Sequence, residues 1–118
     1  MLNRLPRRVE LCIEGKIVGT VEFNRFADSW LFGSFEPTRA FGEFATLFGE
    51  WSLLLHADEN DPQISRAALD EMAKLERKID ALHAELILPG NGDRLPVDQL
   101  NIDGKLVELK VNDPPPST

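Results

Sequence analysis

The chain has 118 residues, 42% of them hydrophobic and 28% charged, which is enough for one globular domain with a single core. Its 20 acidic residues outnumber its 13 basic residues, and the net charge of -7 argues against nucleic-acid binding, which needs a basic surface. The single cysteine, Cys12, excludes an intrachain disulfide and a metal site built from several cysteines.

The sequence also bears on export and on membrane insertion. Arg4, Arg7 and Arg8 lie near the N-terminus without an apolar stretch behind them, so no signal peptide is expected. No uncharged apolar run approaches the roughly 18 residues of a membrane span. Together with the cysteine count, these observations favour a cytoplasmic protein that does not bind membranes.

Residues 8–23 predict a β-hairpin, because apolar and polar residues alternate along the first strand. Two turn registers are open: a two-residue turn pairs Ile13 with Lys16, and a three-residue turn pairs Ile13 with Ile17. The three-residue turn is favoured, and a bulge at Gly19 would reconcile the two registers. The core face then carries Val9, Leu11, Ile13, Ile17, Val21 and Phe23.

A loop is expected over residues 24–29, followed by a third strand over 30–36 that is rich in aromatic residues and interrupted by Gly33. Trp30 begins this strand directly after the loop. Core placement is favoured for so large an apolar side chain, and an exposed Trp30 would serve as an anchor for a partner.

Residues 38–55 predict a helix with Thr38 as its N-cap. Its apolar stripe consists of Phe41, Phe44, Phe48, Trp51 and Leu55. Gly42 and Gly49 flank this stripe, and each costs a helix about 1 kcal/mol relative to alanine. We therefore expect another element, the following helix, to approach closely at these two glycines.

Residues 61–88 form the strongest pattern in the chain, a long amphipathic helix. Its apolar residues recur three or four apart: Ile64, Ala68, Met72, Leu75, Ile79, Leu82 and Leu86. Asp61 is a suitable N-cap before Pro62, and Ser65 is a rival cap. The last residues, 86–88, could instead form a short buried strand, and periodicity does not decide between the two. The short link between the helices predicts an antiparallel helical hairpin.

Residues 96–102 and 105–111 predict a second β-hairpin. Asp103-Gly104 is a strong signal for a type I′ turn, which would place Leu100 opposite Val107. Residues 1–112 then form a single domain, and residues 113–118 form an extended, proline-rich tail.

The predicted fold class is α+β, in the order β-β-β-α-α-β-β. An antiparallel sheet of about five strands would carry the helical hairpin on one face, so that each apolar stripe is buried once. The other face would be a solvated surface of mixed charge, not a groove for an apolar ligand. It would carry Arg8, Glu10, Cys12, Thr20, Glu22, Asn101, Glu108 and Lys110.

No catalytic, cofactor-binding or metal-binding residues are expected. The densest polar cluster lies between the helices and consists of His56, Asp58, Glu59 and Asp61, but it lacks the glycine and the distal glutamate of a calcium loop. His83 lies at the opposite end of the helical hairpin from His56, and Cys12 has no histidine as a predicted neighbour. These residues therefore do not converge on one site.

The favoured function is a small, acidic, non-enzymatic protein-interaction module, such as an inhibitor, an immunity-type protein or a subunit of a complex. It would bind an unidentified protein partner through an acidic surface. The candidate partner-binding residues are Trp30, His56, Asp58, Glu59 and Asp61. The alternative is a structural protein that forms a homodimer through the long helix, and an enzyme or a metal-binding protein is less favoured.

Overall fold

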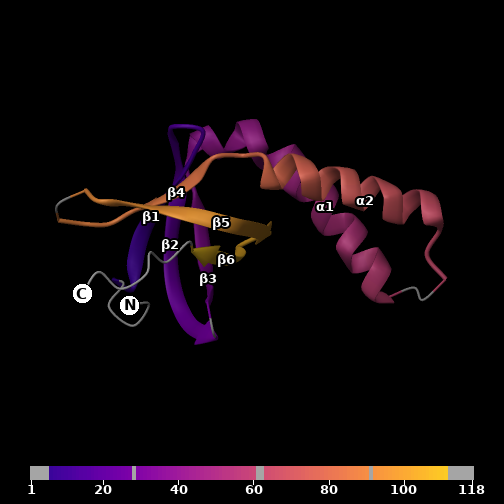
Figure 1. The fold of residues 1–118 in the computed structure, drawn as a ribbon, viewed down its shortest axis with the longest axis horizontal. Helices are drawn as coiled ribbons and strands as arrows, with labels where there is room; N and C mark the ends of the chain where they lie inside the picture. Colours follow the sequence, from indigo (N-terminus) through magenta and orange to yellow (C-terminus); the bar gives the residue numbers. More distant parts are fainter. Residues whose placement is uncertain (1–5, 28, 61–62, 91, 112–118) are drawn as a thin grey trace.

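The computed structural model describes residues 6–27, 29–60, 63–90 and 92–111, without the side chains of 58–60. Six antiparallel strands close into a barrel, and a helical hairpin extends away from it (Figure 1). The elements are β1 (Arg8–Ile13), β2 (Lys16–Ala27), β3 (Trp30–Pro37), the 3₁₀ turn η2 (Arg39–Phe41), α1 (Gly42–Asn60), α2 (Arg66–Asp80), β4 (Ala84–Ile87), β5 (Arg94–Asp103) and β6 (Leu106–Val111).

The α+β class and the antiparallel pairing are confirmed, but the open sheet of five strands is wrong. The strand order around the barrel is β1-β2-β3-β6-β5-β4. The sixth strand, β4, pairs with β1 on one side and β5 on the other, so that Leu86 lies opposite both Leu11 and Leu95. The apolar strand faces therefore pack against each other inside a barrel, and the helices do not cover one face of a sheet.

The closing strand comes from the end of the predicted long helix. Helix α2 stops at Asp80, and Ala84–Ile87 is extended. The helical period continues through Leu82 and Leu86, but two neighbouring strands offer Ala84–Ile87 backbone hydrogen bonds on both edges. Such tertiary pairing outweighs the weak local preference for a helix. Of the two cap candidates, Ser65 accepts a hydrogen bond from Ala68 N at 3.1 Å, while Asp61 lies outside the described residues.

The first hairpin uses both registers considered from the sequence. Glu14 and Gly15 have φ values of 52° and 81°, as a two-residue type I′ turn requires, and Ile13 lies opposite Lys16. The extra residue of the bulge is Val18, and beyond it Leu11 pairs with Gly19 in the register of the three-residue turn. A bulge that reconciles the two registers is confirmed, one residue before Gly19, but the favoured three-residue turn is wrong, and Ile17 is 42% exposed and does not lie on the core face.

The second hairpin turns one residue later than predicted. Asp103 pairs with Leu106, so the turn residues are Gly104 and Lys105, and Ile102 lies opposite Val107. This register is two residues away from the predicted one. Because side chains alternate with a period of two, the shift leaves every residue on its expected face.

Strand β2 is longer than predicted and includes residues 24–27, which were expected to form a loop. The register with β3 shifts between Phe23 and Arg25, so Asn24 lies at a second bulge. The bulge permits polar residues to continue the strand at the rim of the barrel, where bulges are common.

The core joins the barrel interior to the helices. Phe44, Phe48 and Trp51 of α1 are buried with the inward-facing strand residues, which confirms the predicted stripe. The Phe41 ring lies 5.0 Å from the Phe35 ring of β3 and 6.0 Å from Phe48. These aromatic contacts anchor the start of the helical hairpin to the barrel.

Two expectations for the start of α1 and its glycines are wrong. Thr38 makes no side-chain cap, and its hydroxyl donates to the Ile17 carbonyl at 2.7 Å. A Cβ atom placed on Gly42 or Gly49 would meet no described atom within 4 Å, so none of the described elements approaches these glycines closely. The hairpin also leaves Leu53 of α1 74% exposed and Leu69 of α2 40% exposed. Neither described helix is long and apolar enough to cross a membrane.

Candidate interaction groove

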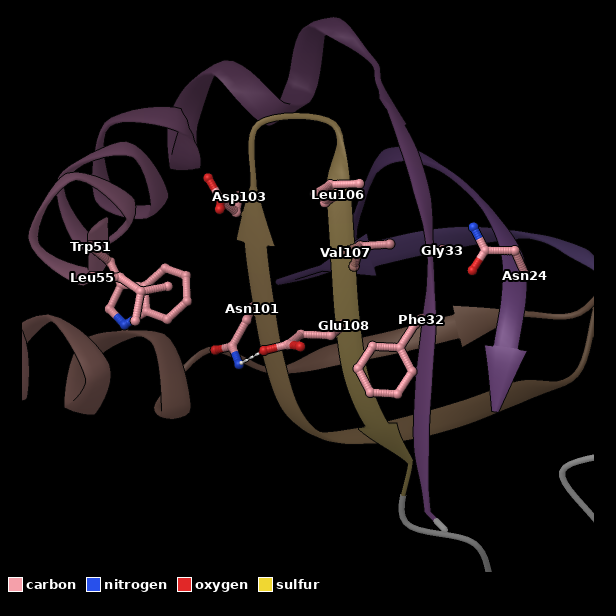
Figure 2. A pocket seen from close by; sticks show the side chains of 10 residues that line it. All are labelled: Asn24, Phe32, Gly33, Trp51, Leu55, Asn101, Asp103, Leu106, Val107 and Glu108. Carbon is pink, nitrogen blue, oxygen red and sulfur yellow. Dashed lines mark hydrogen bonds between the residues drawn. The ribbon is translucent and has the colours of Figure 1, made fainter. Parts of the chain in front are cut away.

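A groove of about 330 Å³ runs between α1 and the outer surface of the barrel (Figure 2). Figure 2 shows Trp51 and Leu55 of α1 on one side, Phe32 of β3 on the other, and Asn101 and Glu108 between them. The lining residues are Asn24, Phe32, Gly33, Trp51, Leu55, Asn101, Asp103, Leu106, Val107 and Glu108.

Strand alternation explains which side chains form the floor. Ile102 of β5 and Val107 of β6 are buried in the barrel, so their neighbours along each strand point outwards. On β5 these are Asn101 and Asp103, and on β6 they are Leu106 and Glu108. Asn101 and Glu108 were expected on a solvated face that is not a groove for an apolar ligand, and this expectation is wrong because α1 lies beside that face.

The two walls of the groove are apolar. Trp51 is only 5% exposed and fixes the position of α1, while Leu55, one turn further along, is half-buried. On the opposite wall, the Arg25 guanidinium lies 4.3 Å from the centre of the Phe32 ring, a cation–π contact. Leu106 is 66% exposed on the floor, so an apolar surface remains accessible.

Asp103 connects the turn between β5 and β6 to α1. The Ser52 hydroxyl donates to Asp103 Oδ1, and His56 Nε2 lies 2.7 Å from Asp103 Oδ2. The hydrogen bond from Ser52 lowers the pKa of Asp103 below its usual value, with a further contribution from His56 that partial burial opposes. Asp103 is therefore an anion at neutral pH.

Serine, histidine and aspartate in contact invite comparison with a nucleophilic triad, but the order of the contacts differs. In a triad the histidine lies between serine and aspartate and accepts the serine proton. Here the carboxylate of Asp103 lies between Ser52 and His56 and accepts a hydrogen bond from each. This arrangement holds the helix to the turn and does not activate the serine.

Glu108 is the second carboxylate of the groove. It accepts a hydrogen bond from the Asn101 amide at 3.0 Å across the β5–β6 pair. The ten residues that line the groove include these two carboxylates and no basic side chain. The floor of the groove is therefore both negatively charged and bordered by apolar side chains.

Of the predicted partner-binding residues that the structure describes, one lies near the groove. His56 contacts Asp103 on its rim. Trp30 is half-buried at the start of β3, opposite Ala27 and Lys110, and does not line the groove. The side chains of Asp58 and Glu59, and the whole of Asp61, lie outside the described residues.

Cys12 and His83 lie elsewhere. Cys12 was expected on the exposed face but is buried, and Arg94 of β5 donates to its Sγ at 3.7 Å. His83 follows α2 and is exposed, and its backbone N–H donates to Glu14. Neither residue lines the groove, and no group of three potential metal ligands occurs among the described residues.

A second groove lies on the other side of Asp103, between α1 and the turn between β5 and β6. It has a volume of about 570 Å³ and includes Gly49 and the exposed Leu53. The Asp103 cluster thus separates two surfaces that share α1 as a wall.

Sequence reasoning missed Ser52, Asp103 and Leu106 as site residues. Alternation identified which strand residues point outwards, and this signal is correct for Asn101 and Glu108. The position of α1 against that face depends on barrel closure, which the strand pattern did not reveal. Searches against protein-family models, curated proteins and solved structures found no match to this chain.

Proposed function

We propose that this protein is a non-enzymatic interaction module that binds a protein partner in the groove between α1 and the barrel. The observation that supports the proposal most is the accessible apolar surface around Leu106, which is 66% exposed beside two carboxylates. Exposed apolar surface with a polar rim is typical of protein-binding sites. The net charge of -7 would favour association with a basic partner.

The groove is suited to recognition for a second reason, which is its rigidity. Its floor consists of two paired strands, and its α1 wall is held by the buried Trp51 and the Asp103 contacts. A site built on fixed elements loses little conformational entropy on binding. The same contacts leave Ser52 and His56 engaged in positioning α1.

The test uses the immobilised protein with lysate of its native host, at low and high salt. The variant Leu106→Ser removes apolar surface from the groove, and Leu69→Ser is the control, an exposed leucine of α2 that lines neither groove. We expect a partner that wild type and Leu69→Ser retain, that Leu106→Ser loses, and that high salt releases because charges are screened. No partner, or one that Leu106→Ser retains equally, would contradict the proposal.

A second candidate function is self-association, and Leu53 favours it. This leucine is 74% exposed on α1, beside the open space at Gly49. The apolar stripe of α2 is less available, because Leu75 and Ile79 are buried in the core. A homodimer would therefore use α1 in place of α2. Light scattering after gel filtration at micromolar concentration tests this, and a monomer, or a dimer that Leu53→Ser leaves intact, would exclude it.

A further inference from the structure

We infer that the groove recognises a lysine or arginine side chain that lies next to an apolar side chain of the partner. This inference rests on the proposed function and specifies the chemistry of the ligand. The cation would lie between the carboxylates of Asp103 and Glu108, and the apolar side chain would contact Leu106 and Leu55.

The register between β5 and β6 places the carboxylates of Asp103 and Glu108 close enough to share one cation. Asp103 lies opposite Leu106, and Glu108 is two residues further along the same face of β6. Such diagonal neighbours in an antiparallel pair have Cβ atoms roughly 7 Å apart. A guanidinium or ammonium group that enters between them would reach both carboxylates.

The charges around the groove determine where the cation would lie. Asp103 accepts a hydrogen bond from Ser52 and contacts His56, which carries a charge only when protonated, and Glu108 accepts a hydrogen bond from the neutral amide of Asn101. The groove's aromatic wall already carries a cation, because Arg25 lies over the Phe32 ring. A second cation would therefore be directed away from Phe32 and towards Glu108, with Asp103, whose two oxygens already contact Ser52 and His56, as the second carboxylate.

Apolar contact and charge act together at this site. An exposed ion pair alone contributes little to binding because water and salt screen it. Contact with Leu106 and Leu55 removes water from the neighbourhood of the carboxylates, which strengthens their attraction for the cation. The ligand must therefore contain both features, and a polar cation such as free lysine would bind much more weakly.

The test is an NMR titration of the full chain, ¹⁵N-labelled, with two synthetic peptides. The first is N-acetyl-Leu-Arg-Leu-amide, and the second replaces arginine by citrulline, which has the same shape without the charge. We expect the arginine peptide to shift the signals of the Asn101 side-chain amide, Leu106 and the Trp51 indole. It should bind about three- to five-fold more tightly than the citrulline peptide, as expected for a partly exposed ion pair.

Two variants identify the groups responsible. Glu108→Gln removes one carboxylate with little change in shape and should reduce the preference for arginine to less than about two-fold. Glu10→Gln, at an exposed position of β1 outside this groove, removes the same charge and should leave the preference unchanged. Because the spectrum of each variant also reports its fold, a loss of binding is separated from a loss of structure.

Three results would overturn the inference. These are the absence of shifts in the groove at millimolar peptide, equal binding of the two peptides, and shifts spread over the acidic surface with no focus on the groove. If one of these occurs while Leu106→Ser still abolishes capture of the native partner, the groove remains the binding site and only the specificity for a basic side chain is wrong.

Discussion

The barrel and the helical hairpin differ in how completely their apolar residues are covered. Each of the six described strands of the barrel pairs with two neighbours, and interior residues such as Leu11, Leu31 and Leu109 are fully buried. The helical hairpin contacts the barrel along one side only, and Leu53 of α1 and Leu69 of α2 remain exposed. The apolar residues of the barrel are therefore more completely covered than those of the helical hairpin.

The difference also shows where a partner can bind. Because the described strands close into a ring, the sheet has no terminal strand along which a partner strand could be added over its whole length. Accessible apolar surface beside two carboxylates instead lies where α1 passes over the outer face of β5 and β6 (Figure 2). The barrel thus presents the groove, and the projecting helix provides one of its walls.

The largest expected effect on stability comes from creating a cavity in the barrel interior. Phe35→Ala removes a buried ring that contacts Phe41 and should lower the free energy of unfolding by about 3–5 kcal/mol. The control Leu53→Ser should change it by less than about 0.5 kcal/mol. Urea denaturation measures both. Similar losses for the two variants would show that the hairpin is as tightly covered as the barrel.

A smaller loss is expected from adding one methyl group to the barrel. A Cβ atom on Gly19 would overlap the Phe35 ring and the Glu36 carbonyl oxygen. Gly19→Ala should therefore destabilise the fold by about 1–3 kcal/mol through overpacking. Thermal unfolding followed by circular dichroism provides the measurement, and an unchanged midpoint would mean that β2 and β3 are not packed as described.

The same substitution in the helical hairpin should have the opposite sign. Gly49 lies within α1 with open space around it, so Gly49→Ala should raise the free energy of unfolding by up to about 1 kcal/mol. Chemical denaturation of Gly49→Ala and Gly19→Ala measures the free energy of unfolding for this matched pair of glycine substitutions. Destabilisation by Gly49→Ala would indicate that another element contacts this position.

The smallest effect concerns the junction between the two regions. Because the pKa of Asp103 is lower in the folded protein, its stabilising effect is complete above the unfolded value of about 3.9 and is lost as the pH falls through the folded value. Asp103→Asn should therefore be less stable than wild type at neutral pH, and the difference should shrink below about pH 4. Asp98→Asn controls for the loss of one charge. A difference independent of pH would contradict the role of this carboxylate.

The sequence predicted most elements but not their closure. Alternation identified Val9, Leu11 and Ile13 of β1 and the buried residues of β6, but it placed the buried Cys12 on the exposed face. The register shift in the second hairpin left each residue on its predicted face because it spans two residues. The stripe of Phe44, Phe48 and Trp51 was also correct. These features are local, and periodicity reports them directly.

Features that depend on distant partners were not predictable. Residues 84–87 fit the helical period, and only pairing with β1 and β5 makes them a strand. Closure by this strand fixes the barrel, and α1 then lies beside Asn101 and Glu108. Ser52 and Asp103 are 51 residues apart in the sequence, and no spacing rule connects a helix residue to a hairpin turn at that separation.

The position of the groove depends on barrel closure, and the most direct test is nuclear Overhauser contacts between backbone protons of neighbouring strands. With closure, residues around Leu86 should show contacts to β1 near Leu11 and also to β5 near Leu95. Contacts to one of these strands alone, or the sequential pattern of a helix over residues 84–87, would contradict the barrel and with it the proposed groove.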